Sequence, residues 1–124
     1  LINLEYLDLS GNLIEELPES IGEMESLQEL RLSGNRLKAL PASIGRLHSL
    51  SKLQLRGNLL AELPESFENL VLVEELDLAG NQLVALEFLE HFKELARLDL
   101  SDNPLEESTR RMLDRAHPMA DITL

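Results

Sequence analysis

One sequence pattern recurs along the whole chain and restricts the folds that the chain can adopt. The stretch from residue 27 to residue 50 reads LQELRLSGNRLKALPASIGRLHSL, and most of the chain repeats it. The aligned asparagines follow one another at 23, 23, 23 and 22 residues: Asn12, Asn35, Asn58, Asn81 and Asn103. A fixed short period predicts a solenoid, because one unit cannot bury its apolar face alone and must stack on its neighbours. The 124 residues are therefore expected to form one domain around one continuous core.

The apolar positions of each copy follow the pattern L-x-x-L-x-L-x-x-N-x-L. In the first copy, the residues that fit this pattern are Leu4, Leu7, Leu9, Asn12 and Ile14. This pattern resembles that of the leucine-rich-repeat family. The resemblance implies an α/β fold: a right-handed solenoid, or horseshoe, with a parallel concave sheet, an irregular or 3₁₀ convex side and a C-terminal cap of one helix and one strand. The expected single domain covers 1–124, with repeats at about 4–26, 27–49, 50–72, 73–94 and 95–105 and a cap at 106–124.

Each L-x-L segment is predicted to be a strand, since residues at a spacing of two point to the same side and the leucines need a core. Glu29 and Arg31 then point outward. The glycine before each asparagine, such as Gly34, suits a sharp turn where a side chain would crowd the backbone. Each asparagine is expected to turn inward and to satisfy buried backbone groups, which forms a ladder along the stack.

The segments after the turns differ between repeats. Three copies contain L-P-x-S-[IF], which turns the chain onto the convex side and places Ile21, Ile44 and Phe67 in the core. This ending resembles the 23-residue class found in intracellular signalling scaffolds, Roco-type proteins and bacterial effectors. The fourth copy lacks the proline and one residue, which predicts a short 3₁₀ or α-helical segment and resembles the 22-residue class. Phe88 lies outside its apolar register, and we expect it to pack against the neighbouring turn rather than to serve as an exposed contact.

The two ends of the array are expected to differ. At the C-terminal end, Ser108 or a residue near it is predicted to cap a helix that ends near His117, followed by a last strand at 121–124. An alternative reading of Ile122-Thr123-Leu124 is a ligand for a PDZ domain. At the other end, Leu4 and its neighbours lack a polar cap, so we expect a fragment of a longer protein or a cover supplied by missing repeats or self-association.

Charge and cysteine usage limit the partners and the compartment. The formal net charge is −12, which disfavours nucleic acid and anionic membrane surfaces as partners. The chain contains no cysteine, so a disulfide framework and a thiolate metal site are excluded. We expect a cytoplasmic location, or secretion into a host cell if the protein is a bacterial effector.

The sequence offers no set of residues that resembles a catalytic or metal site. His48, His91 and His117 fall at unrelated registers, without a second ligand at a standard spacing. Adjacent glutamates such as Glu15 and Glu16 have diverging side chains, whereas acid–base carboxylates must converge across a cleft. We therefore expect no enzyme activity, no metal and no cofactor.

The resemblance implies that partners bind the concave, solvent side of the strands, here called the strand face, which is therefore the candidate binding site. Its predicted partner-binding residues are Tyr6, Asp8, Glu29, Arg31, Lys52, Gln54, Arg56, Asp77, Arg97 and Asp99. One column across the sheet alternates in sign after Tyr6, in the order Glu29, Lys52, Glu75 and Arg97. Mutual pairing is the favoured interpretation of Glu29, Lys52 and Glu75, at about 0.2–1 kcal/mol per contact.

Partner binding is favoured for Tyr6, Arg31 and Arg56, because tyrosine and arginine dominate binding hot spots. Arg31 has Asp8 as an alternative partner, and Arg56 has Asp77. These residues predict a non-catalytic protein-interaction module that displays the strand face rigidly. Two alternatives remain: a targeting domain of a larger kinase, GTPase or bacterial ubiquitin ligase, and a structural spacer.

Overall fold

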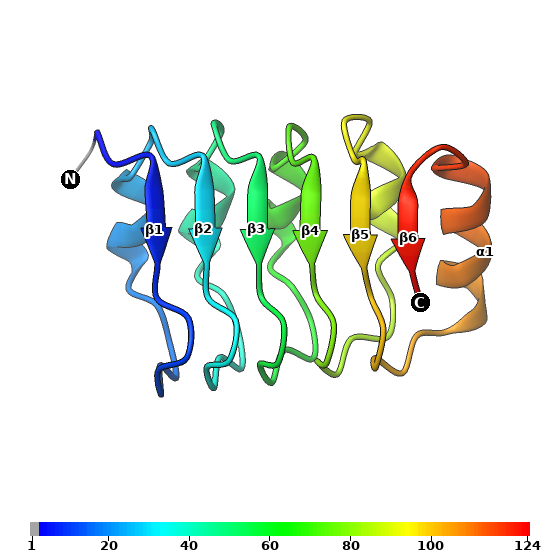
Figure 1. Cartoon of the computed structure of the whole chain (residues 1–124), viewed down its shortest axis with the longest axis horizontal. Helices are drawn as coiled ribbons and strands as arrows, with labels where there is room; N and C mark the ends of the chain where they lie inside the picture. The colour runs from blue at the N-terminus through cyan, green and yellow to red at the C-terminus, as the bar shows by residue number, and fades with distance from the viewer. Residues whose placement is uncertain (1–2) are drawn as a thin grey trace.

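The computed structural model describes residues 3–124; Leu1 and Ile2, with which the predicted domain begins, lie outside the described residues. Six short strands form one parallel sheet in the order of the chain (Figure 1). The strands are β1 (Tyr6–Asp8), β2 (Glu29–Arg31), β3 (Lys52–Gln54), β4 (Glu75–Asp77), β5 (Arg97–Asp99) and β6 (Asp121–Thr123). The other elements are the 3₁₀ segments η1 (Glu19–Glu23), η2 (Ala42–Arg46), η3 (Glu65–Asn69) and η4 (Glu87–His91), and the helix α1 (Glu107–Ala116).

The core lies between the sheet and the 3₁₀ segments, as the leucine spacing predicts. Leu30, Leu53 and Leu76 pair in register across neighbouring strands and are almost completely buried. Phe67 and Ile44 enter the same core from the opposite side and are also buried. Each repeat therefore buries its apolar residues against the adjacent repeats, which is the packing of a solenoid.

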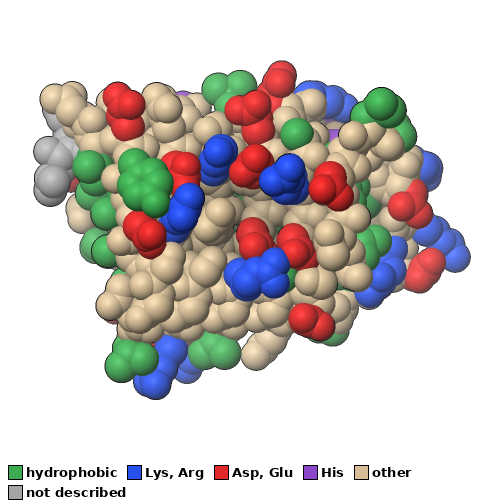
Figure 2. Space-filling model, viewed as in Figure 1, with side chains coloured by type: hydrophobic (Ala, Val, Ile, Leu, Met, Phe, Trp, Pro, Cys, Tyr) green, Lys and Arg blue, Asp and Glu red, His purple; other side chains and the backbone are tan. Residues whose placement is uncertain are grey.

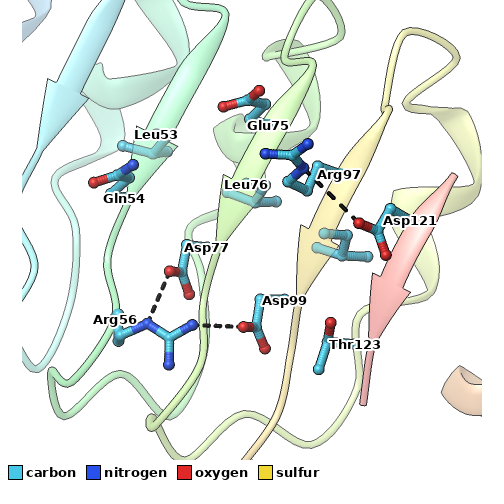
Figure 3. Close-up of a pocket in the computed structure, with 11 residues that line it drawn as sticks. Leu53, Gln54, Arg56, Glu75, Leu76, Asp77, Arg97, Asp99, Asp121 and Thr123 are labelled. Carbon is cyan, nitrogen blue, oxygen red and sulfur yellow. Dashed lines mark hydrogen bonds and ion pairs between the residues drawn. The ribbon is translucent and has the colours of Figure 1, made fainter.

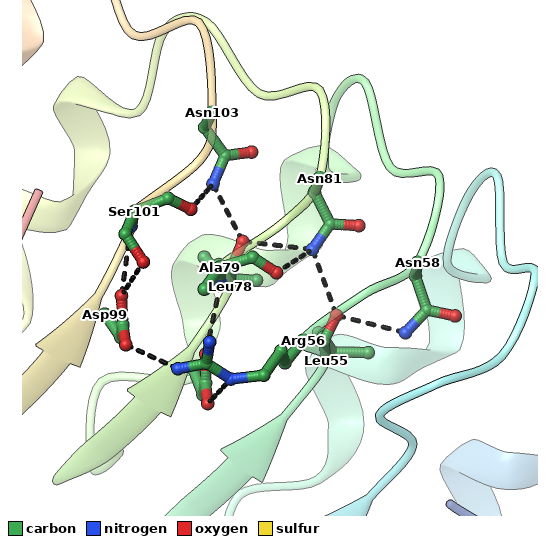
Figure 4. A network of polar contacts seen from close by, with 10 residues as sticks. Leu55, Arg56, Asn58, Leu78, Ala79, Asn81, Asp99, Ser101 and Asn103 are labelled. Carbon is green, nitrogen blue, oxygen red and sulfur yellow. Dashed lines mark hydrogen bonds and ion pairs between the residues drawn. The ribbon is translucent and has the colours of Figure 1, made fainter. Parts of the chain in front are cut away.

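The turns after the strands confirm the roles predicted for glycine and asparagine. Gly11, Gly34, Gly57 and Gly80 have φ values between +68° and +71°, a region in which a side chain is strained. The amide of Asn58 donates to the carbonyl oxygens of Leu32 and Leu55, both at 3.0 Å, and its Oδ1 accepts from the N–H of Leu37 at 3.1 Å. Asn81 and Asn103 repeat this arrangement, so the amides form a ladder along the turns (Figure 4).

The 3₁₀ segments are more regular than the sequence indicates. The fourth copy forms η4, as predicted, but each of the three proline-containing copies also forms a five-residue 3₁₀ segment directly after its proline. Proline has the extended conformation that precedes these segments, and its missing N–H costs nothing there. Phe88 packs edge-on against Phe67 and Phe92, with ring centroids 5.8 and 5.9 Å apart, which confirms the packed interpretation.

The C-terminal cap forms a helix and a strand, and the N-cap position of the helix lies two residues before Ser108, the first of the residues considered for its cap. Glu106 occupies the N-cap position and makes no capping hydrogen bond through its side chain. Ser108 lies inside the first turn, where its hydroxyl donates to carboxylate oxygens of Glu87 and Glu106 instead. The helix stops before His117, as predicted, and the buried imidazole Nε2 of that residue lies 2.6 Å from the carbonyl oxygen of Leu89. β6 then pairs with β5 and confirms the predicted last strand.

Candidate functional site

The strand face is built by the register of the parallel strands. Tyr6, Glu29, Lys52, Glu75 and Arg97 are paired in sequence across β1 to β5, and Asp121 of β6 extends the same row. Figure 2, which has the same view as Figure 1, shows acidic and basic side chains intermixed across the face that the strands present. The alternation of side chains along a strand explains the row, since the intervening leucines occupy the core.

An aromatic and charged cluster lies at the β1 end of the strand face. The guanidinium of Arg31 lies over the ring of Tyr6, 5.3 Å from its centroid, and its Nε lies 2.5 Å from a carboxylate oxygen of Glu29. The alternative pairing of Arg31 with Asp8 does not form: the carboxylate of Asp8 accepts the backbone N–H of Ser10 at 2.9 Å, and hydrogen bonds from Ser10 lower the pKa of Asp8. The cation–π contact and the Glu29 bond together fix the position of Arg31 beside a half-exposed Tyr6.

The row of alternating charges pairs only in part. Among the described residues of the row, an ion pair forms between Lys52 and Glu75 at 3.9 Å, whereas Glu29 contacts Arg31 of its own strand. Arg97 lies 3.9 Å from Asp121 instead of pairing with Glu75. A long, exposed basic side chain can pair with any of several nearby carboxylates at nearly equal free energy. Such pairs contribute about 0–1 kcal/mol to the stability of the fold.

Arg56 connects two neighbouring strands near the C-terminal end of the strand face. Its Nε lies 2.9 Å from Asp77, which is the pairing considered as the alternative for Arg56, and its Nη2 lies 2.5 Å from Asp99. Asp99 also accepts the backbone N–H and the hydroxyl of Ser101, at 3.0 and 2.6 Å (Figure 4). Charge-assisted hydrogen bonds of this kind are stronger than neutral ones, so these side chains are held in place.

The surroundings of Asp99 set its ionisation. Burial raises the pKa of Asp99, but the hydrogen bonds from Ser101 and from Arg56 outweigh it and hold the pKa below the ordinary value of 3.8. Because the pKa is lower in the folded state, the ionised carboxylate stabilises the fold above about pH 4, and this contribution is lost as the pH falls through the lowered pKa.

We expect Ser101→Ala to lower the free energy of unfolding by about 1 kcal/mol at neutral pH, because one hydrogen bond to a charged group is lost. The difference from the unmodified chain should shrink as the pH falls below about 4. Urea denaturation from pH 7 to pH 2.5 measures this difference. Ser33→Ala is the matched control, since Ser33 occupies the same register and makes no hydrogen bond to a carboxylate. A Ser101→Ala effect that is independent of pH would contradict the assignment.

A shallow hollow of about 260 Å³ lies over β3 to β6 (Figure 3). Its charged lining consists of Arg56, Glu75, Asp77, Arg97, Asp99 and Asp121. Gln54 and Thr123 add neutral polar groups, and leucines form its floor. The hollow therefore offers hydrogen-bonding groups of both signs to a side chain of another protein. Within residues 3–124, no group of three or more histidine and carboxylate side chains is placed to hold a metal ion.

The ten predicted residues share one face. Tyr6, Glu29 and Arg31 form one group, here called the Tyr6 cluster. Five others line the hollow: Gln54, Arg56, Asp77, Arg97 and Asp99. The remaining two belong to neither group, since Asp8 accepts a hydrogen bond from Ser10 and Lys52 pairs with Glu75. Sequence reasoning missed Asp121 and Thr123 as members of this face. The spacing of Ile122 and Leu124 contained the signal, since a strand with these residues on the core side places Asp121 and Thr123 on the solvent side.

No helix among the described residues is long and apolar enough to cross a bilayer.

Comparison with known proteins agrees with this geometry. A sequence model of the leucine-rich repeat region matches residues 1–118. The chain belongs to the leucine-rich-repeat family. Leucine-rich-repeat domains are in general non-catalytic domains that bind other proteins. No curated protein matches this leucine-rich-repeat chain at a significant level.

Several solved structures share the leucine-rich-repeat fold of this chain. A leucine-rich-repeat protein of Leptospira interrogans is 35% identical, with a TM-score of 0.89 over 97% of this chain and 31% of its own. The leucine-rich-repeat domain of APL1B is 26% identical, with a TM-score of 0.78 over 85% of this chain and 34% of its own. The functional domain of InlJ from Listeria monocytogenes, which includes a cysteine ladder, is 21% identical, with a TM-score of 0.81 over 98% of this chain and 25% of its own. The chain thus spans about a third or less of these proteins.

Proposed function

We propose that this chain is a protein-interaction module that binds its partner through the strand face. The observation that supports this proposal is the fixed geometry of the strand face. Six parallel strands in register hold its side chains, and Arg31 and Arg56 are already held by hydrogen bonds to carboxylates. Side chains that are ordered before binding lose little entropy on binding. Rigid display of this kind increases affinity without any movement of the backbone.

The Tyr6 cluster is the proposed anchor of the interface. Tyr6 is 49% exposed, and Arg31 is held against its ring while its side chain stays 39% exposed. Among residues 3–124, the Arg31 guanidinium donates a hydrogen bond only through Nε, so its terminal N–H groups are available to acceptors on a partner. Tyrosine and arginine are the residue types that contribute most at protein interfaces.

The hollow over β3 to β6 is the proposed second contact. Arg56 is committed to Asp77 and Asp99, whereas Glu75 and Asp121 make only contacts of 3.9 Å with exposed cations. Polar groups of a partner can therefore replace these weak pairs at a small cost in free energy.

The cellular location that we propose for the protein is the cytoplasm, or a host cell if the parent protein is a bacterial effector.

A second candidate function is substrate targeting within a larger enzyme. Its support is that this chain covers only 31% of the relative from Leptospira interrogans, so a parent protein of similar length has room for a catalytic domain. Binding by the strand face is common to both functions, and catalysis would then lie in another part of the parent protein. The length and motifs of the parent reading frame distinguish them.

We expect the double substitution Tyr6→Ala and Arg31→Ala to weaken partner binding by about 2 kcal/mol or more, roughly thirtyfold in Kd. The measurement is quantitative mass spectrometry of proteins that the immobilised chain captures, followed by titration of the purified partner. Arg46→Ala is the control, because Arg46 is an exposed cation on η2, away from the strands. Unchanged capture by a folded double variant would contradict binding by the Tyr6 cluster and favour the role of a spacer.

A further inference from the structure

The hollow over β3 to β6 lies between two rows of side chains that the register of the strands fixes. The first row consists of Glu75, Arg97 and Asp121, on β4, β5 and β6. The second row consists of Asp77, Asp99 and Thr123, on the same three strands. Figure 3 shows the two rows on opposite sides of the hollow. Both rows contain carboxylates, so the cations that already neutralise each row decide what the hollow can bind.

The second row is neutralised within the chain. Asp77 and Asp99 lie opposite each other on neighbouring strands, and like charges in this arrangement repel. The guanidinium of Arg56 donates to both carboxylates, at 2.9 and 2.5 Å. Their other oxygens accept the backbone N–H groups of Ala79 and Ser101, at 3.1 and 3.0 Å. Asp77 and Asp99 therefore have their hydrogen bonds already, and a partner gains little from them.

The first row is neutralised only loosely. A carboxylate oxygen of Glu75 lies 3.9 Å from Nζ of Lys52, and one of Asp121 lies 3.9 Å from Nε of Arg97. A hydrogen bond from N–H to oxygen is about 2.7–3.2 Å long, so these contacts are ion pairs without a hydrogen bond. The side chains of Arg97 and Asp121 are 70% and 75% exposed, and water screens their attraction. Another cation can therefore replace Lys52 or Arg97 beside these carboxylates.

The charge of the hollow favours a cation over an anion. Four of the charged side chains in its lining are acidic and two are arginines, of which Arg56 is held by the second row. A partner carboxylate would find the N–H groups of Arg97, but Glu75 and Asp121 flank that residue on the neighbouring strands, about 4.8 Å to each side. Repulsion from these two carboxylates, and from a chain with a formal net charge of −12, opposes an acidic group.

The size and the floor of the hollow suit one long side chain. Its volume of about 260 Å³ is below the roughly 300–1,000 Å³ of sites for drug-sized ligands. Leu53, Leu76 and Leu98 form an apolar floor beneath the polar rows. Lysine and arginine have an apolar stem and a charged end, so such a side chain can lay its stem on leucines while its charge meets carboxylates.

We propose that the hollow receives a lysine or arginine side chain of the partner, whose cationic group takes the place of the Arg97 guanidinium beside Glu75 and Asp121. This inference rests on the proposed function, because it names the partner group that binds at the second contact of the strand face. Arg97 then competes with the partner for the same carboxylates. Removal of Arg97 should strengthen binding, whereas removal of the Asp121 charge should weaken it.

The test uses the nitrogen-15-labelled chain and three capped tripeptides, in which arginine, lysine or glutamate stands between two glycines. NMR titrations follow the backbone amide signals of Leu76, Leu98 and Ile122, which lie on the three strands beneath the hollow. The arginine and lysine peptides should shift these signals to saturation. The glutamate peptide should leave them unchanged.

Three variants separate the proposed roles. Asp121→Asn should weaken binding of the arginine peptide by about threefold, since one exposed ion pair is lost. Arg97→Gln should strengthen the same binding by about threefold, because the competing cation is removed. Arg46→Gln is the matched control: it removes an exposed positive charge on η2, outside the hollow, and should change the affinity much less.

Two results would overturn the proposal. One is the absence of shifts at the hollow with both cationic peptides. The other is binding of the glutamate peptide that Arg97→Gln abolishes, since Arg97 would then bind a carboxylate. Both results are distinct from a failure of the proposed function, because the capture experiment with the Tyr6 and Arg31 double variant tests that function at the other end of the strand face.

Discussion

Phe67→Ala should lower the free energy of unfolding by about 3–5 kcal/mol, because it removes a large aromatic side chain from a core that cannot fully close around the cavity. Phe67 is completely buried and packs against two other rings, stacked on Phe92 at 6.1 Å and edge-on to Phe88 at 5.8 Å. Equilibrium denaturation in urea, followed by circular dichroism, measures the loss.

Phe88→Ala provides the comparison for this prediction. Phe88 belongs to the same group of rings but is only partly buried, so its removal leaves a space that water can enter. We expect a clearly smaller loss than for Phe67→Ala. Equal losses for the two variants would show that the group of rings, rather than burial of Phe67 in the core, determines the stability at this boundary.

Asn58→Ala should lower the free energy of unfolding by about 2 kcal/mol or more, since it leaves the N–H of Leu37 without its partner and removes one of the two asparagine hydrogen bonds that the carbonyl oxygens of Leu32 and Leu55 each accept. Each buried polar group left unpaired costs about 1–3 kcal/mol. Asn58 is 4% exposed, so water cannot replace the lost hydrogen bonds. Thermal and urea denaturation of the variant give the loss directly.

Asn12→Ala is the matched control for Asn58→Ala, because the two residues occupy the same position of their repeats. Asn12 is exposed and bonds only within its own turn, where water can satisfy the carbonyl oxygens after substitution. We expect a loss below about 1 kcal/mol. A loss as large as that of Asn58→Ala would indicate that the asparagine acts within its turn and that the ladder between repeats contributes little.

The backbone of this protein could be predicted from its sequence because its contacts link neighbouring repeats in a fixed register. The leucine spacing located the strands, the glycines located the turns with positive φ, and Asn35, Asn58 and Asn81 located the ladder. The sequence placed the helix cap at or near Ser108 but not at one residue, because a capping interaction depends on where the first helical turn begins, and a shift of two residues changes the partner of the Ser108 hydroxyl.

Only the tertiary structure decided which charged side chains of the strand face meet. The register placed Glu29, Lys52, Glu75 and Arg97 in one row, but Arg97 turned to Asp121, and Arg56 also reached Asp99 beyond its predicted partner. Leucines and asparagines are determined by the sequence because burial leaves each of them one set of contacts. A half-exposed arginine has several carboxylates within reach at nearly equal free energy, so its partner depends on the positions of the surrounding strands.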